Sequence, residues 1–135
     1  MSLVGNITGF QHLGIPVSNL EKSIHFYEQM GFRIENRSEF KETGGVTRVA
    51  FMELGNFCLE LYQTPEGVAV SRDAGPINHF ALDVRDIDEA FQVFKKEGFS
   101  IVEDKPVSLP LRLNGVKYFM VLGPDGEKVE FNQLM

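Results

Sequence analysis

Apolar and polar positions alternate along two short stretches of the chain, residues 10–17 and 78–84. A period of two predicts β-strands with one buried face. The apolar positions of the two stretches are Leu13, Ile15, Val17, Phe80, Leu82 and Val84. The positions between them hold small or polar side chains and include one histidine in each stretch, His12 and His79. Both histidines are therefore predicted on the face opposite the apolar side chains.

A stripe of apolar residues with helical spacing follows each of these strands. The residues recur at i, i+4 and i+7, which predicts an amphipathic helix that packs on the apolar face of the strand. The stripes are Leu20, Ile24 and Tyr27, then Ile87, Phe91 and Phe94. Capping-box spacings predict where the helices begin, and a glycine predicts where each ends. The capping pairs are Ser18 with Glu21 and Asp86 with Glu89, and the glycines are Gly31 and Gly98.

The two halves of the chain follow one pattern, because positions 67 residues apart match over more than twenty residues. The matches include His12 with His79, Leu20 with Ile87, Tyr27 with Phe94 and Gly31 with Gly98. Three more strand-like segments follow each helix: 33–37, 47–54 and 57–62, then 100–103, 117–122 and 128–132. The predicted fold class is α+β, with tandem βαβββ modules at residues 7–63 and 77–133 and a linker at 64–76.

The last strand of each module carries a carboxylate on the face turned away from the helix, Glu60 in the first module and Glu130 in the second. If the two sheets curl toward one another, both carboxylates converge with His12 and His79 on one cavity. Two imidazoles and two carboxylates suit one divalent ion, with Zn or Ni first and Co, Mn or Fe as alternatives. The alternative interpretation is structural: a strand histidine is often a packed residue, a strand glutamate is often solvated, and duplication copies both.

Composition and charge narrow the class of partner. Of the 135 residues 43% are hydrophobic, and 13 Lys and Arg against 19 Asp and Glu leave a net charge of −6 without a basic cluster. Nucleic acid and anionic membrane surfaces are therefore disfavoured, and a small-molecule substrate is expected. The longest apolar run, residues 118–122, is too short to span a membrane. The single cysteine, Cys58, fits a cytoplasmic protein that needs no disulfide.

Several segments resemble the vicinal oxygen chelate superfamily, also called the glyoxalase/bleomycin-resistance/dioxygenase group. They are HLGIPV at 12–17, SIHFY at 23–27, LEL at 59–61, NHFALDV at 78–84 and GPDGEKVEF at 123–131. The resemblance implies a curved mixed sheet around a metal cavity. The order His12, Glu60, His79, Glu130 resembles the metal set of lactoylglutathione lyase (glyoxalase I), so that all four are implied metal ligands.

The resemblance also implies a reaction. The metal chelates two neighbouring oxygens of the substrate and stabilises an enediolate, while a ligand carboxylate acts as general base. The candidates for that base are Glu130 and Glu60, of which Glu130 is favoured by analogy with glyoxalase I. The expected activity is that of a lyase or isomerase acting on a small α-oxo compound or its thiol adduct. Members assemble the site within one chain or across a dimer, and a homodimer is expected because open sheets leave edges to cover.

Two positions depart from the glyoxalase I pattern. Pro16 and Thr64 stand where glyoxalase I has an arginine and an asparagine that bind glutathione, which argues against glutathione as the thiol. Arg112 lies near the position of the family's anion-binding lysine, and either binds substrate or is a surface arginine. The segment around it, 105–115, is either an apolar lid or an edge strand or dimer contact. Cys58 is expected to be a packed thiol, and His25 lies off the predicted site.

Other activities of the superfamily stay open. An epimerase also uses proton abstraction, and a thiol transferase acts on antibiotics. An extradiol-type dioxygenase usually has two histidines and one carboxylate, so the fourth ligand at Glu60 argues against it. A non-catalytic binder, as in bleomycin-resistance proteins, needs no metal, and the four ligand-type residues argue against that function.

Overall fold

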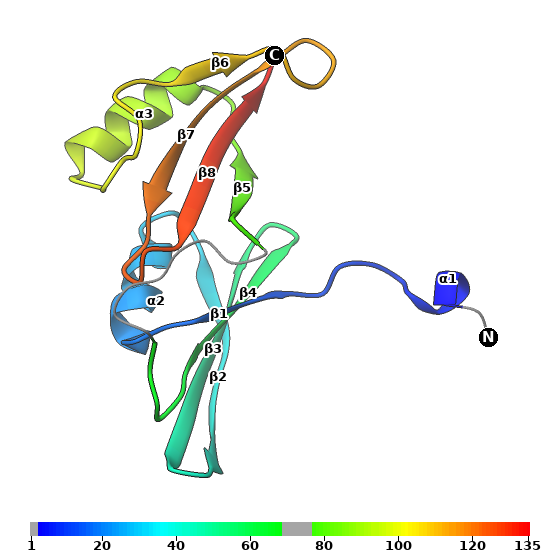
Figure 1. Cartoon of the computed structure of the whole chain (residues 1–135), viewed down its shortest axis with the longest axis vertical. Helices are drawn as coiled ribbons and strands as arrows, with labels where there is room; N and C mark the ends of the chain where they lie inside the picture. Colours follow the sequence, from blue (N-terminus) through cyan, green and yellow to red (C-terminus); the bar gives the residue numbers. More distant parts are fainter. Residues whose placement is uncertain (1–2, 69–76) are drawn as a thin grey trace. The chain divides into compact units, whose positions relative to one another are not determined.

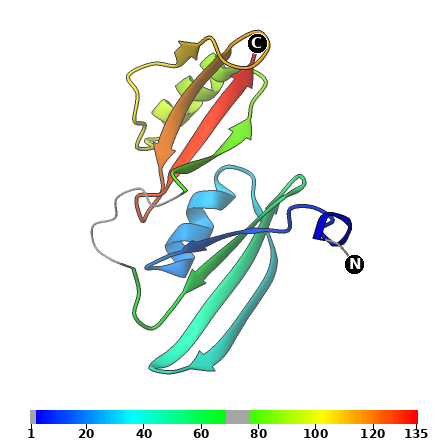
Figure 2. The ribbon, with the colours of Figure 1, turned by 45° about the vertical axis from the view of Figure 1, so that its right-hand side comes forward.

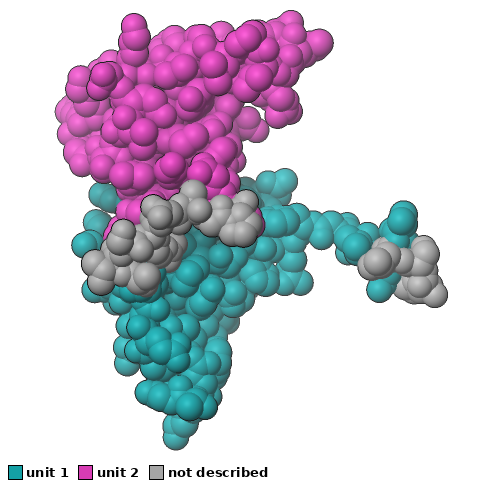
Figure 3. Space-filling view, viewed as in Figure 1, with its two compact units in different colours: residues 1–68 teal, residues 69–135 magenta. Residues whose placement is uncertain are grey.

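The computed structural model of the chain describes residues 3–68 and 77–135 (Figure 1). The chain divides into two compact units, Met1–Val68 and Ala69–Met135 (Figure 3). Of the linker predicted at 64–76, residues 69–76 lie outside the described residues. Each unit has a four-stranded sheet of its own, and the two sheets have the same strand pairing.

The first unit contains a short helix that the sequence pattern did not predict, α1 (Leu3–Asn6), and then a βαβββ module. The elements of the module are β1 (Leu13–Pro16), α2 (Leu20–Glu28), β2 (Arg33–Glu42), β3 (Gly45–Leu54) and β4 (Phe57–Gln63). The strand order is β1-β4-β3-β2, with β1 parallel to β4 and the other pairs antiparallel. The ladder between β2 and β3 extends to Glu42 and Gly45, well beyond the predicted end at residue 37.

The second unit repeats this arrangement. Its elements are β5 (His79–Asp83), α3 (Ile87–Lys96), β6 (Val107–Leu109), β7 (Val116–Leu122) and β8 (Lys128–Leu134). The order β5-β8-β7-β6 again has one parallel pair, β5 with β8 (Figure 2). The predicted α+β class and the βαβββ repeat are therefore confirmed. None of the helices in the described parts of the chain is long and apolar enough to cross a membrane.

One predicted strand of the second module is wrong. In the segment 100–103, Ile101 makes an isolated bridge to Val121, flanked by backbone hydrogen bonds of 2.9 Å from Val102 N to Met120 O and from Leu122 N to Ser100 O, but no continuous strand forms. The Glu103 carboxylate instead accepts a hydrogen bond from the Met120 backbone N–H at 2.7 Å, and so takes a bond that a neighbouring strand would otherwise accept. The fourth strand of the sheet is β6, which pairs only with β7. Part of the segment 105–115 is therefore an edge strand.

The core of each unit lies between its helix and one face of its sheet. The predicted stripe of α2 is buried, and α2 packs on β3 and β4, whose residues Leu59 and Leu61 are completely buried. In the second unit, Phe94 of α3 lies 4.5 Å from Phe131 of β8 between ring centroids. Because alternate residues of a strand face opposite sides, burial of these side chains turns the residues between them away from the helix.

Helices α2 and α3 each have a side-chain cap at the residue that precedes the first turn. Asn19 Oδ1 accepts a hydrogen bond from Lys22 N at 3.1 Å, and Asp86 Oδ1 accepts one from Glu89 N at 3.0 Å. The start predicted at Ser18 is therefore wrong by one residue, while Asp86 is confirmed. Asn19 is the position that the 67-residue repeat matches with Asp86, so the two observed caps are equivalent, while Glu21 binds Arg37 of β2 at 2.9 Å.

The first backbone N–H of α2 and of α3 donates a hydrogen bond to a glutamine side chain. This glutamine comes from the last strand of the same module. Gln63 Oε1 accepts from Leu20 N at 2.7 Å, and Gln133 Oε1 accepts from Ile87 N at 3.0 Å. These N–H groups have no partner within the helix, since the first turn lacks preceding carbonyls. The two glutamines thus join each helix to its sheet at a position that local sequence does not reveal.

Replacing Gln133 with alanine is expected to lower the free energy of unfolding by about 1 kcal/mol, because Ile87 N loses its acceptor in a part-buried position. Urea unfolding followed by circular dichroism measures this loss. The control is Gln92→Ala, an exposed position on α3, where alanine favours the helix and no loss is expected. Equal effects of the two substitutions would contradict a capping role for Gln133.

Candidate metal centre

The first unit brings His12 next to Glu60. His12 lies just before β1, and β1 runs parallel to β4 with Gly14 opposite Glu60. His12 Nε2 is 3.5 Å from Glu60 Oε1, and the two side chains are 32% and 29% exposed. Both groups are thus reachable from solvent on the sheet face turned away from α2. The imidazole and the ring of Phe51 make a T-shaped contact with centroids 5.5 Å apart, and Phe51 lies opposite Glu60 in the ladder.

The second unit brings His79 next to Glu130 in the same way. His79 is the first residue of β5, and Ala81 of this strand lies opposite Glu130 of β8. His79 Nε2 is 3.2 Å from Glu130 Oε1. The side chain of Glu130 is only 12% exposed, while that of His79 is 37% exposed. Each unit therefore contributes one close imidazole–carboxylate pair.

An amide side chain orients each imidazole. Gln11 Oε1 lies 2.9 Å from His12 Nδ1, and Asn78 Oδ1 lies 2.9 Å from His79 Nδ1. Both amides immediately precede their histidine, at matching places in the two modules. Sequence reasoning did not identify them, although their repetition before each histidine was a usable signal. Such partners set the ring orientation and tautomer of metal-binding histidines.

These contacts define the chemistry of each pair. An amide oxygen only accepts hydrogen bonds, so Nδ1 carries the proton and a neutral ring leaves a lone pair on Nε2. That lone pair faces a carboxylate oxygen, which is also an acceptor. Two acceptors at this separation need a proton or a cation between them. A divalent cation therefore fits the donor set of each pair.

Each unit brings together only two candidate metal ligands, one histidine and one glutamate. In residues 3–68 and 77–135, no three His, Cys, Asp or Glu side chains form a group that could hold a metal ion. A pair alone is fewer than the three or four protein ligands of typical zinc sites. Neither pair is by itself a complete protein site.

Glu130 has a further partner that Glu60 lacks in the described residues. Asn132 Nδ2 donates to Glu130 Oε2 at 2.7 Å. Asn132 lies two residues further along β8 and therefore on the same face as Glu130. Sequence reasoning did not identify this residue either.

Three other residues were singled out from the sequence. Within the described residues, two of them make no polar contact with the predicted ligands, and the third is a weak nucleophile. Arg112 is exposed in the turn between β6 and β7, with a left-handed φ of 61°. Among the interactions within the described residues, none joins Arg112 to the four predicted ligands. His25 is exposed on α2. Burial, together with the carboxylates of Glu53, Glu35 and Glu60, raises the pKa of the Cys58 thiol, so it stays protonated and weakly nucleophilic near neutral pH.

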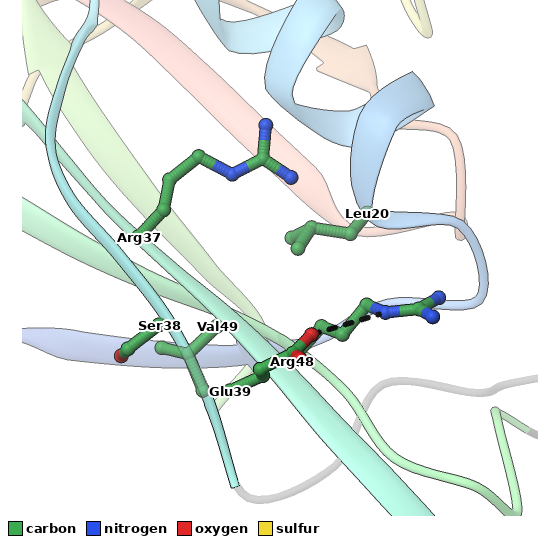
Figure 4. A pocket seen from close by; sticks show the side chains of 6 residues that line it. All are labelled: Leu20, Arg37, Ser38, Glu39, Arg48 and Val49. Atoms are coloured by element: carbon green, nitrogen blue, oxygen red, sulfur yellow. Dashed lines mark ion pairs between the residues drawn. The ribbon is translucent and has the colours of Figure 1, made fainter.

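A separate cavity of about 240 Å³ lies in the first unit, beside the start of α2 (Figure 4). It is lined by Leu20, Arg37, Ser38, Glu39, Arg48 and Val49. Both of its arginines have carboxylate partners, since Arg48 Nε lies 3.7 Å from Glu39 Oε2 and Arg37 binds Glu21. None of the predicted metal ligands lines this cavity.

Comparisons with known proteins agree with this architecture. The family model described as Glyoxalase/Bleomycin resistance protein/Dioxygenase superfamily matches residues 9–131. A Bacillus subtilis (strain 168) protein, described as the uncharacterized protein YwbC, is 32% identical over 124 residues, which cover 90% of this chain and 94% of that protein. A lactoylglutathione lyase of Neisseria meningitidis serogroup A is 31% identical over 128 residues, covering 90% of this chain and 88% of the enzyme.

The fold likeness extends to solved structures. The crystal structure of a glyoxalase family protein from Enterococcus faecalis superposes with a TM-score of 0.75 at 22% identity, over 92% of this chain and 96% of that one. The match of the family model to nearly the whole chain agrees with the paired βαβββ modules. The chain belongs to the glyoxalase/bleomycin resistance protein/dioxygenase superfamily.

Proposed function

We propose that this protein is a metal-dependent lyase or isomerase of the glyoxalase I type, acting on a small α-oxo compound or its thiol adduct. The observation that carries the proposal is the occurrence of one His–Glu contact in each module at matching places, His12 with Glu60 and His79 with Glu130. Similarity to a lactoylglutathione lyase over most of both chains supports it.

The four residues His12, Glu60, His79 and Glu130 would together hold one divalent ion, Zn or Ni first, then Co, Mn or Fe. When bound, the ion would supply Lewis-acid stabilisation of negative charge on two neighbouring substrate oxygens. Gln11 and Asn78 hold the Nδ1 atoms and thereby direct each Nε2 toward the site. A carboxylate of the set, Glu130 or Glu60, moves the proton between the two substrate carbons.

The proposal includes a homodimer. Strands β1 and β2 end one sheet, and β5 and β6 end the other, in the described parts of the chain. Strand edges carry backbone groups that pair readily with another chain. A dimer would allow the His12–Glu60 pair of one chain to complete a site with the His79–Glu130 pair of either chain. Sedimentation equilibrium is expected to give twice the 15.2 kDa mass of the chain.

The thiol is proposed to be one other than glutathione. Pro16 ends β1 and Thr64 follows β4, and neither carries the side chain that the glyoxalase I pattern uses for glutathione. Proline lacks a charged group, and threonine offers only a short hydroxyl in place of an amide. Arg112, exposed in its turn, is the candidate for an anionic group of the substrate.

The test is turnover by the metal-loaded protein. Methylglyoxal is supplied alone, with glutathione, and with a small thiol such as cysteine, and the hydroxyacyl product is measured. Turnover that falls at least about 100-fold after chelation is expected, since the metal and its ligands act as one unit. A protein that binds metal but converts none of these mixtures contradicts the reaction class and favours an epimerase, dioxygenase or thiol transferase. A protein that binds no divalent ion is a non-catalytic binder instead.

A further inference from the structure

The two modules place different residues beside their glutamates. Tyr62 pairs with Pro16 in the first module, and Asn132 pairs with Asp83 in the second. Their carbonyls accept matching hydrogen bonds, from Val17 N at 2.9 Å and Val84 N at 3.0 Å. Tyr62 and Asn132 are therefore structural equivalents, each two residues after its glutamate. The repeat keeps the histidine and the glutamate but changes this neighbour.

The two oxygens of the Glu130 carboxylate contact two different residues. Glu130 Oε2 receives the Asn132 amide at 2.7 Å, while Glu130 Oε1 lies 3.2 Å from His79 Nε2. A carboxylate only accepts hydrogen bonds, so the amide must present its nitrogen to Glu130. The carboxylate is consequently fixed in rotation and nearly buried, at 12% exposed.

Glu60 is held less firmly. Its contact with His12 is longer, at 3.5 Å, and its side chain is 29% exposed. Within the described residues, no hydrogen bond joins Tyr62 to Glu60, and Phe51 opposite Glu60 offers only an apolar ring. The first module therefore gives its carboxylate fewer polar partners than the second module does.

The carbonyl end of the Asn132 side chain differs from its nitrogen end. Its Oδ1 is buried and has no hydrogen-bond partner among the described residues. A buried carbonyl without a partner lowers stability, and an apolar side chain of similar shape removes that cost. An asparagine that binds the glutamate at one end and is unpaired at the other is explained by what it does for Glu130.

We propose that Asn132 is a positioning residue that makes the two carboxylates unequal: it orients Glu130 as a metal ligand, whereas Glu60 has no such donor among the described residues. This inference rests on the proposed metal-dependent function. It assigns different roles to two residues that the sequence repeat makes equivalent.

Titration with Co²⁺, followed by its visible absorption spectrum, tests the proposal independently of turnover. Asn132→Leu keeps the shape, removes the donor and removes the unpaired carbonyl. We expect the affinity for Co²⁺ to fall about 10- to 100-fold, as for other residues that orient metal ligands. The matched control is Tyr62→Phe, which is expected to change the affinity less than about twofold because Tyr62 does not orient Glu60.

The two glutamates are compared in the same assay. Glu130→Gln is expected to weaken Co²⁺ binding at least about tenfold more than Glu60→Gln, because the fixed carboxylate contributes a preorganised ligand. Equal losses in the two variants, or an unchanged affinity in Asn132→Leu, overturn this inference and leave the proposed function standing. Absence of Co²⁺ binding by the unmodified protein overturns both.

Discussion

Phe119→Ala is expected to lower the free energy of unfolding of the second unit by about 3–5 kcal/mol. Phe119 is completely buried in β7. Its ring centroid lies 5.3 Å from that of Phe91 in α3 and 5.3 Å from that of Phe131 in β8. Truncation therefore leaves a cavity between the helix and the sheet and removes aromatic contacts on both sides. A loss of this size is a large part of the stability of a typical domain.

Urea unfolding followed by NMR amide signals measures this loss for the second unit by itself. Val93→Ala is the matched control, because Val93 is 52% exposed on α3 of the same unit, and its truncation is expected to change stability by less than about 0.5 kcal/mol. Phe119→Leu keeps most of the volume and is expected to fall between the two. A small effect of Phe119→Ala would mean that the helix–sheet core repacks around the missing ring.

His79→Ala is expected to lower divalent-metal affinity by more than about 100-fold. Loss of a residue that only orients a metal ligand costs about 10- to 100-fold in affinity, and loss of a proposed ligand itself should cost more. The side chain supplies the Nε2 atom that faces Glu130 at 3.2 Å. Removing the imidazole leaves that carboxylate without its histidine partner. Metal content after dialysis, measured by plasma emission, and competition with a chelator give the affinity.

The third histidine supplies the control. His25 is exposed on α2, so His25→Ala is expected to bind metal as the unmodified protein does. If His25→Ala loses metal as strongly as His79→Ala, the ion binds surface histidines and the proposed site is wrong. If neither variant loses metal, the ion is held by residues other than the predicted four.

A mixture of two variants reveals how the pairs combine. Consider a dimer in which each site takes the His12–Glu60 pair from one chain and the His79–Glu130 pair from the other. If one chain carries His12→Ala and the other carries His79→Ala, both substitutions fall in the same site. The second site then has all four side chains. Mixing after mild unfolding and refolding then restores metal binding at one site per mixed dimer. If each chain builds its own site, the mixture binds no more than the separate variants do.

Local patterns predicted the elements because their periods depend only on backbone geometry. A period of two in β1 and β5 and the i, i+4, i+7 stripes of α2 and α3 follow from strand and helix geometry and from the need to bury one side. The repeat of 67 residues strengthened each assignment, since the same pattern occurs twice. Accordingly the α+β class and the faces of the strands agree with the structure.

The two errors have different origins. In the segment 100–103 the Glu103 carboxylate accepts the Met120 N–H, and this contact between distant residues has no periodic signature. The helix cap is Asn19 instead of Ser18, and here the repeat was a usable signal, because it matches Asn19 with Asp86.

The amino-acid sequence by itself determined the two modules, the burial of their helix stripes and the presence of a histidine and a glutamate on the exposed face of each sheet. Only the tertiary structure decided which residues meet. Parallel pairing of β1 with β4 and of β5 with β8 sets the register that puts each histidine beside the glutamate of its own unit, 48 and 51 residues away in the chain. The same register placed Asn132, and not Tyr62, in a hydrogen bond to its glutamate, because hydrogen bonding depends on side-chain reach and donor direction, which hydrophobic periodicity does not encode.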